Sequence, residues 1–267
     1  MVPDRADGFE SLTAIVDQRG QYDGVVAWYK DWFGEKYLAL YAHRDAEEAE
    51  RHVNFVERVF AADVAPKTPR AVLDLASGAG RHTEALRRRG YRALGIDLSL
   101  TLLAQVPGLP RVAGDMRYLP FASESFDWVL NFFTSFGYFE GERENFEVLE
   151  EINRLLAPDG GFLIDLFNRE KVISELVAEE TQERDGTEIE IERWYDADAQ
   201  RVNKRIRLVE GDKSETHVES VRAYRKEEVT IGLQWAGLEV SGVYGSFDGE
   251  SFRHDSQRLI VVGRKPG

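Results

Sequence analysis

The segment Ala71-Val-Leu-Asp-Leu-Ala-Ser-Gly-Ala-Gly-Arg-His-Thr83 predicts a β-strand, a tight turn and the start of a helix. An apolar run with one acid, Asp74, leads into Gly78 and Gly80, and a helical pattern follows through Leu86. The two glycines permit unusual φ values and let a ligand approach the backbone closely. The helix start adds free N–H groups and the positive end of the helix dipole. We therefore expect a nucleotide-like ligand. The acid, and the lack of a run of phosphate-binding residues, indicate that this ligand carries an amine or another positive centre.

Further strand-like units follow along the chain. Residues 91–97 form a second apolar strand that ends in Asp97, about 20 residues after the glycine turn, the distance expected for a carboxylate that binds ribose hydroxyls. The remaining units are residues 111–116, residues 125–131 with the aromatic loop 132–139, and residues 160–165 after a helical pattern over 145–156. Alternation of strands and helices is typical of a parallel sheet with helices on both faces, where ligands bind at the carboxyl ends of the strands.

Five short motifs stand in order within these units. They are Leu-Asp-Leu-Ala-Ser-Gly-Ala-Gly from residue 73, Gly-Ile-Asp-Leu-Ser from residue 95, Gly-Asp-Met from residue 114, Phe-Asp-Trp-Val from residue 126 and Leu-Ala-Pro-Asp-Gly-Gly from residue 156. Their order and spacing resemble the class I S-adenosylmethionine-dependent methyltransferases, strongly over residues 71–168 and in outline at the C-terminus. Two positions depart from the pattern, because Ala76 stands where many relatives carry a glycine and Ser77 where many carry a cysteine.

The resemblance implies an α/β fold, a Rossmann-like seven-stranded and mostly parallel sheet with a final antiparallel strand, and S-adenosyl-L-methionine as the cofactor. The expected cofactor-binding residues are Tyr37, Asp74, Ala76, Ser77, Gly78, Gly80, Arg81, Asp97, Leu98, Asp115, Met116, Asn131 and Phe132. The catalytic residue stays open, with Tyr41, Tyr138 and His43 as candidates, and no metal site is expected.

Several of these residues have an alternative structural role. Asp74 could cap a helix, but an unpaired buried carboxylate is unfavourable, so we expect it to meet turn amides or the methionine ammonium. Asp97 could cap the following helix and Asp115 a turn, whereas the resemblance gives them ribose and the adenine amine as partners. Arg81 either faces the methionine carboxylate or is solvated. His82 is expected to be structural or exposed, since a single helical histidine lacks a catalytic partner.

The aromatic residues also allow two interpretations. Tyr37 and Tyr41 lie four residues apart and share a helix face, so they either pack the N-terminal region on the core or place one ring near the sulfonium. Asn131 and the loop after it would line the transferable methyl group. Within that loop, Thr134, Ser135 and Tyr138 carry the hydroxyls that could orient a substrate.

Three regions are predicted. Residues 1–69 form an N-terminal helical cap over the mouth of the sheet, because residues 45–61 have helical spacing. Residues 171–224 form an inserted antiparallel β lid, because three segments in it alternate with period two. Those segments are residues 187–195, 201–208 and 216–224. The methyltransferase core is residues 70–170 and 225–267, which closes with a helix over 225–236 and strands over 238–244 and 258–264.

A basic run in the insertion, Arg201, Lys204, Arg205 and Arg207, could mark an anionic partner. Glutamates 188, 190 and 192 on the preceding strand favour pairing across the hairpin instead. The formal net charge of −14 also disfavours binding to nucleic acid. We therefore expect a small-molecule substrate.

Composition indicates a cytoplasmic globular enzyme. The 267 residues are 43% hydrophobic, enough for one large domain or a domain with an insertion. The absence of cysteine excludes disulfides and thiolate metal sites. The polar N-terminus predicts no signal peptide, and no apolar run approaches the ~20 residues of a membrane span. The oligomeric state stays open.

The expected reaction is an in-line displacement, in which the protein aligns nucleophile, methyl group and sulfur and excludes water. A base is needed only for a protonated nucleophile, and the sequence contains no assembled His-Asp pair. This favours an amine or acidic oxygen of a small molecule. One rival is a nicotinamide-dependent oxidoreductase, whose third glycine would fall at Thr83. The other is a non-catalytic regulatory module that binds the methyl donor.

Overall fold

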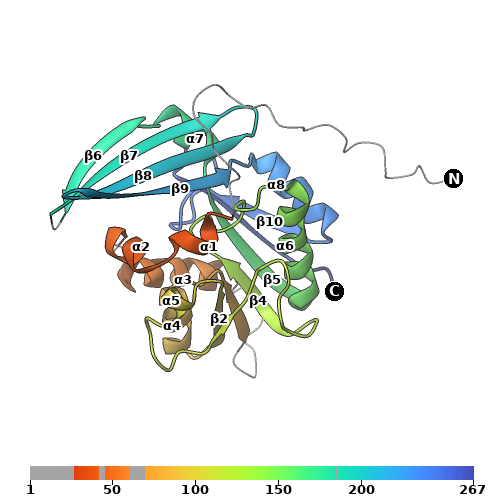
Figure 1. Ribbon diagram of the computed structural model, residues 1–267. Coiled ribbons are helices and arrows are strands. Elements are labelled where there is room, and N and C mark those ends of the chain that lie inside the picture. Colours follow the sequence, from red (N-terminus) through yellow and green to blue (C-terminus); the bar gives the residue numbers. More distant parts are fainter. Residues whose placement is uncertain (1–26, 42–45, 61–69, 185) are drawn as a thin grey trace.

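A seven-stranded sheet forms the centre of the computed structural model, which describes residues 27–41, 46–60, 70–184 and 186–267. The strand order is β10-β11-β5-β4-β1-β2-β3 (Figure 1). The strands are β1 (Ala71–Leu75), β2 (Arg92–Asp97), β3 (Arg111–Ala113), β4 (Phe126–Asn131), β5 (Leu156–Phe167), β10 (Glu239–Tyr244) and β11 (Arg258–Arg264). The first five are parallel, and β11 runs antiparallel between β5 and β10. The predicted Rossmann-like sheet is confirmed.

Helices cover both faces of this sheet because its central strands are apolar on both sides. On one face, α3 (Ala46–Phe60) and α4 (Arg81–Arg88) share a core with Leu163. On the other, α6 (Glu142–Leu155) and α8 (Lys226–Trp235) share a core with the neighbouring Phe162. Successive residues of a strand point to opposite faces, so β5 contributes to both cores. The short α5 (Leu100–Leu103) contacts β2 and β3.

The N-terminal region divides between two places. The helices α1 (Tyr29–Trp32) and α2 (Glu35–Leu40) lie below the antiparallel sheet in Figure 1. In contrast, α3 packs on a face of the main sheet and not over its mouth, because its apolar stripe, which includes Val53 and Val56, is buried against strand residues such as Leu130. Residues 1–26, 42–45 and 61–69 of the predicted cap lie outside the described residues.

The insertion is an antiparallel sheet, which we call the lid. It contains four strands in the order β6 (Glu179–Arg184), β7 (Thr187–Asp196), β8 (Arg201–Glu210) and β9 (Lys213–Arg222). The prediction of three strands was wrong in missing β6, because its sequence Glu-Glu-Thr-Gln-Glu-Arg has no apolar alternation and forms a strand by pairing with β7. A short helix, α7 (Arg169–Ser174), links β5 to the lid.

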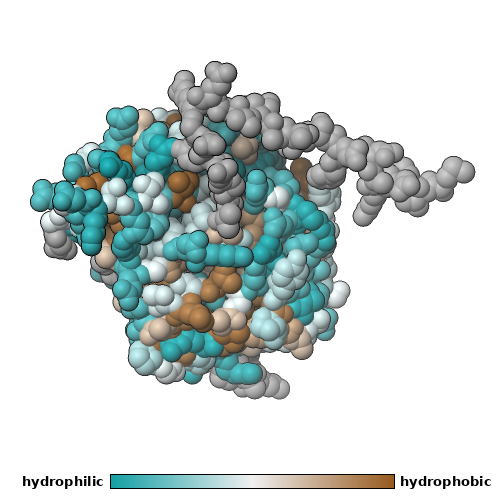
Figure 2. All heavy atoms as spheres, viewed as in Figure 1, coloured by the Kyte–Doolittle hydropathy of each residue, from teal (hydrophilic) through white to brown (hydrophobic). Residues whose placement is uncertain are grey.

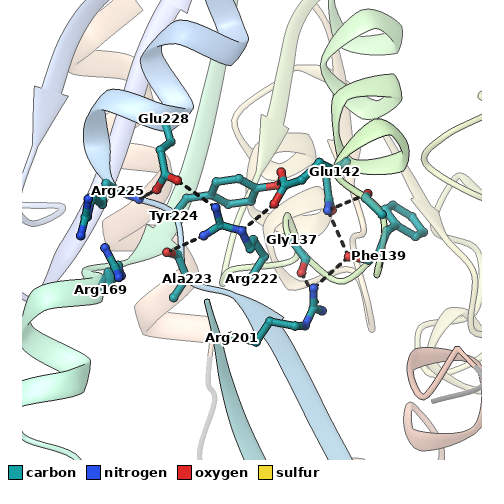
Figure 3. Close-up of polar contacts among 12 residues, drawn as sticks. Gly137, Phe139, Glu142, Arg169, Arg201, Arg222, Ala223, Tyr224, Arg225 and Glu228 are labelled. Atoms are coloured by element: carbon teal, nitrogen blue, oxygen red, sulfur yellow. Dashed lines mark hydrogen bonds and ion pairs between the residues drawn. The ribbon is translucent and has the colours of Figure 1, made fainter. Parts of the chain in front are cut away.

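Two arginines fasten the lid to the loop after β4 and to α6 (Figure 3). Arg201 donates to the backbone carbonyls of Gly137, Tyr138 and Phe139 at 3.0–3.2 Å. Arg222 donates to Glu142 at 2.6 Å and to Glu228 at 2.8 Å. These bonds tie the base of the lid to the loop after β4 and to the helices α6 and α8.

The basic run of β8 therefore has more than one role. Arg205 and Arg207 pair across the hairpin with Glu192 and Glu190, as predicted. Arg201 and Lys204 do not pair with this row of glutamates, because Arg201 lies at the base of the lid and Lys204 lies on its inner face. The prediction of cross-strand pairing was correct for half of the run.

The outer surface is predominantly polar on the face shown in Figure 2, where hydrophobic residues form small separate groups. Among the described residues, no helix combines the length and apolar composition needed to cross a membrane.

Candidate functional site

A cavity of about 520 Å³ lies at the carboxyl edge of the main sheet, beneath α1, α2 and the lid. Its volume is in the range of small-molecule and cofactor sites. Of the predicted site residues, the structure brings these to its wall: Tyr37, Tyr41, Asp74, Ala76, Ser77, Gly78, Arg81, Asp97, Leu98, Asp115, Met116, Phe132 and Tyr138. Gly80 and Asn131 are not on the wall, and His43 lies outside the described residues.

The glycine turn brings backbone to the wall at the end of β1. Ala76 and Gly78 both have a φ of 56°, so the turn holds an alanine in the left-handed region that favours glycine. Gly80, with a φ of 84°, precedes α4, and a Cβ atom there would lie 2.4 Å from Leu109 Cδ2. Gly80 therefore shapes the turn from behind, while residues 76–78 face the cavity.

Asp74 is the buried acid of this turn. Its side chain accepts a hydrogen bond from Thr83 Oγ1 at 2.6 Å. Burial raises the pKa of Asp74 to about 7, although hydrogen bonds from Thr83 oppose the shift. The charge of Arg81 also acts to lower the pKa of Asp74, but burial outweighs it. A positively charged ligand group near this carboxyl would favour its ionised form.

Asp97 ends β2 and orders the turn. Its two carboxylate oxygens accept hydrogen bonds from the backbone N–H groups of Gly78 and Ser99, each at 2.8 Å. Burial raises the pKa of Asp97 against the effect of these backbone bonds. The cap of α5 is Ser99, whose hydroxyl accepts from Leu102 N, so Asp97 is not the capping side chain. Each carboxylate oxygen retains capacity for a further donor, such as a ligand hydroxyl.

Asp115 and Asn131 already have protein partners. Burial alone would raise the pKa of Asp115, but hydrogen bonds and the charge of Arg117, 2.6 Å away, lower it overall. The amide of Asn131 is buried and donates to the carbonyl of Leu75 at 2.9 Å. Asn131 thus lies behind the cavity and fixes β4 against β1, and the prediction that it lines the methyl group was wrong.

His82 has a partner that sequence reasoning missed. Its Nε2 lies 3.0 Å from Nδ1 of His52 on α3, and its ring stacks on Phe132 with centroids 4.0 Å apart. Burial is the main cause that lowers the pKa of His52 to about 3, and burial together with His52 lowers the pKa of His82. Both rings are therefore neutral at physiological pH. Their pairing depends on the contact of α3 with α4, and no local pattern signals it.

Arg81 precedes His82 in α4 and is not simply solvated. Its guanidinium pairs with Glu48 at 3.0 Å and lies 5.1 Å from the ring centroid of Phe133. Arg81 also lines the cavity, so its charge stands beside Asp74 and the glycine turn.

The lid side of the cavity carries a hydrogen-bonded network. Glu219 Oε1 accepts from Trp32 Nε1 at 2.6 Å and from Tyr41 Oη at 3.1 Å. Lys204 Nζ donates to Tyr41 Oη at 2.5 Å. Sequence reasoning missed Glu219 and Lys204, which lie far from Tyr41 in the chain. Their position on the inner face follows from the β8–β9 register, in which Lys204 is opposite Glu219.

Aromatic rings complete this side of the cavity. Tyr138 packs against Trp28 at 4.8 Å and against Phe33 at 5.8 Å between ring centroids. Tyr37 packs against Phe33 at 4.8 Å and against Tyr41 at 4.7 Å. These rings form an apolar wall next to the charged network.

Comparison with known proteins supports this fold. Residues 73–164 match the model of a methyltransferase domain. The cypemycin N-terminal methyltransferase of Streptomyces sp. is 29% identical over 223 residues, covering 74% of this chain and 84% of that protein. A demethylmenaquinone methyltransferase of Thermobifida fusca is 42% identical over 67 residues, covering 22% of this chain and 28% of that protein.

Solved structures share the architecture over most of the chain. The CcbJ methyltransferase from Streptomyces caelestis superposes with a TM-score of 0.74 at 19% identity, covering 89% of this chain and 99% of that chain. The sugar N-methyltransferase KedS8 from Streptoalloteichus sp. has a TM-score of 0.66 at 20% identity, covering 96% and 100%. At these identities the likeness establishes the fold.

Proposed function

We propose that this chain, which is a class I S-adenosylmethionine-dependent methyltransferase, methylates a nitrogen or oxygen of a small molecule bound between the main sheet and the lid. The observation that carries the proposal is the network of Glu219, Tyr41 and Lys204 on the lid side of a covered cavity. A covered cavity of about 520 Å³ suits a small acceptor better than a macromolecule.

The sheet side of the cavity fits S-adenosylmethionine. Asp97 would bind the ribose hydroxyls, and Asp74 would bind the methionine ammonium, which gives a buried carboxyl a cationic partner. Arg81 would attract the methionine carboxylate, and Asp115 and Met116 would border the adenine. When bound, the cofactor supplies a methyl group activated by a sulfonium.

The lid side would receive the acceptor. Glu219 is held by hydrogen bonds from Trp32 and Tyr41, so its carboxylate has a fixed position. It would attract an ammonium group and accept its proton, after which the neutral amine attacks the methyl group in line. A nitrogen acceptor is favoured for this reason. Similarity to KedS8, a sugar N-methyltransferase, and to the cypemycin N-terminal methyltransferase also favours a nitrogen acceptor.

The test separates cofactor from acceptor. In titration calorimetry, the protein should bind S-adenosylhomocysteine and should not bind NAD. Incubation with labelled methyl donor should then label components of a metabolite extract, and not tRNA, DNA or protein. Labelling of a macromolecule alone would refute the small-molecule proposal and leave the cofactor assignment intact.

A further inference from the structure

A second cavity of about 320 Å³ lies between α7, the segment after it and the lid. It shares two wall residues with the main cavity, Arg193 of β7 and Val202 of β8. The strand register places both on the same face of the lid, because Arg193 is opposite Lys204 and Tyr195 is opposite Val202. The two cavities are therefore neighbours, and both lie against the same face of the lid.

Arg193 lies where the two cavities meet, because it lines both of them. Its guanidinium pairs with Glu180 of β6 at 2.7 Å. The two side chains are 25% and 36% exposed, so this ion pair is of the weak, partly solvated kind. A ligand that extends from one cavity into the other can displace such a side chain at small cost.

The second cavity has no uncompensated charge among its described lining residues. Lys171 pairs with Glu175 at 2.8 Å, and Arg193 pairs with Glu180. The rest of the wall is apolar, with Val172 and Val177 among its members, apart from the amide of Gln257. Such a surface fits an uncharged group with both apolar and hydrogen-bonding parts.

We propose that the second cavity is a subsite for the uncharged, partly apolar remote end of an elongated acceptor, whose amine lies near Glu219 in the main cavity. This inference rests on the proposed function and adds the shape and polarity of the acceptor. The main cavity must hold the cofactor as well, so it leaves room chiefly for the reacting end of such a molecule. Arg193 and Val202 lie where the acceptor passes between the cavities.

Val177 offers a direct test, because it lines the second cavity and is 58% exposed, so the fold tolerates a larger side chain there. The probe is the small acceptor that the labelling screen identifies, together with a truncated analogue that keeps the amine and lacks the remote end. Val177→Trp should raise KM for the full acceptor by about tenfold or more and leave kcat and the affinity for S-adenosylhomocysteine unchanged. The truncated analogue should show the same KM with both enzymes.

Two further variants control for general effects. Val177→Asp introduces a charge into the same subsite and should also raise KM for the full acceptor. Ile231→Trp enlarges a 45% exposed residue on α8, outside both cavities, and should change nothing. An unchanged KM in both Val177 variants, with methyl transfer intact, overturns the subsite and spares the proposed function. If no small molecule is labelled by the wild-type enzyme, both proposals fail together.

Discussion

The sheet side and the lid side of the cavity are built in opposite ways. On the sheet side, Asp74, the turn 76–78 and Asp97 come from one continuous βαβ stretch, in which local hydrogen bonds hold each group. On the lid side, Tyr41, Lys204 and Glu219 come from α2, β8 and β9, which only the folded chain brings together. Under the proposed function, one part of the chain would bind the cofactor and another part would bind the acceptor.

The largest effect should separate chemistry from cofactor binding. Glu219→Gln removes the proposed proton acceptor but keeps its shape, so the methyl-transfer rate should fall by about 100-fold or more. The affinity for S-adenosylhomocysteine, measured by calorimetry, should stay within the error of the wild type. Glu190→Gln is the matched control, because Glu190 pairs with Arg207 on the other face of the lid. A rate within twofold of the wild type in Glu219→Gln would show that Glu219 is not the proton acceptor.

The next effect concerns the sheet side. Asp97→Ala removes a carboxylate that orders the glycine turn and would bind ribose, so binding of S-adenosylhomocysteine should weaken by about 1–3 kcal/mol. Calorimetry measures the loss directly, with the exposed Asp198→Ala as control. Unchanged affinity would remove Asp97 from the cofactor site.

A smaller effect is the release of a proton from the carboxyl of Asp74 when the cofactor binds. With a pKa of about 7, raised by burial, the carboxyl is largely protonated at pH 6 in the free protein. The raised folded-state pKa favours the fold at low pH, and that contribution is lost as the pH rises through 7. Binding of the methionine ammonium should lower the pKa and release about one proton near pH 6.

Calorimetry at pH 6 in buffers of different ionisation enthalpy measures that proton. The release should disappear in Asp74→Asn. Wild-type binding enthalpies that do not depend on the buffer would mean that the ammonium lies elsewhere.

The last effect concerns the stability of the fold, through His52 and through His82, which lines the main cavity. Burial lowers the pKa of both imidazoles, so the neutral pair stabilises the fold above pH 6.5, and this contribution is lost as the pH falls toward 3. The double variant His52→Leu and His82→Leu should show a flatter decline of Tm between about pH 7 and about pH 4. The difference should amount to roughly 1–4 kcal/mol of unfolding free energy.

Thermal unfolding across this pH range checks the prediction, with His254→Leu at an exposed position as control. An equally steep decline in the double variant would show that other groups cause the acid sensitivity.

The sequence alone was sufficient for the main sheet and for most of the sheet side. Strand period, glycine positions and strand-end acids are local signals, so β1 to β5, Asp74 and Asp97 could be located before the fold was known. The same signals could not show that the side chain of Asn131 turns away from the cavity toward the carbonyl of Leu75. The sequence locates the end of a strand, but it does not fix the direction in which the last side chain points.

Only the tertiary structure decided the lid side and the histidine pair. β6 lacks an apolar period and is a strand because β7 offers it backbone partners. Lys204 belongs to a basic run that in sequence suggests cross-strand pairs, yet the register turns it inward to Tyr41. His82 gains its partner through the packing of α3 on α4. In each case the deciding contact joins residues distant in the chain, so its energy is absent from any local pattern and appears only when the elements pack.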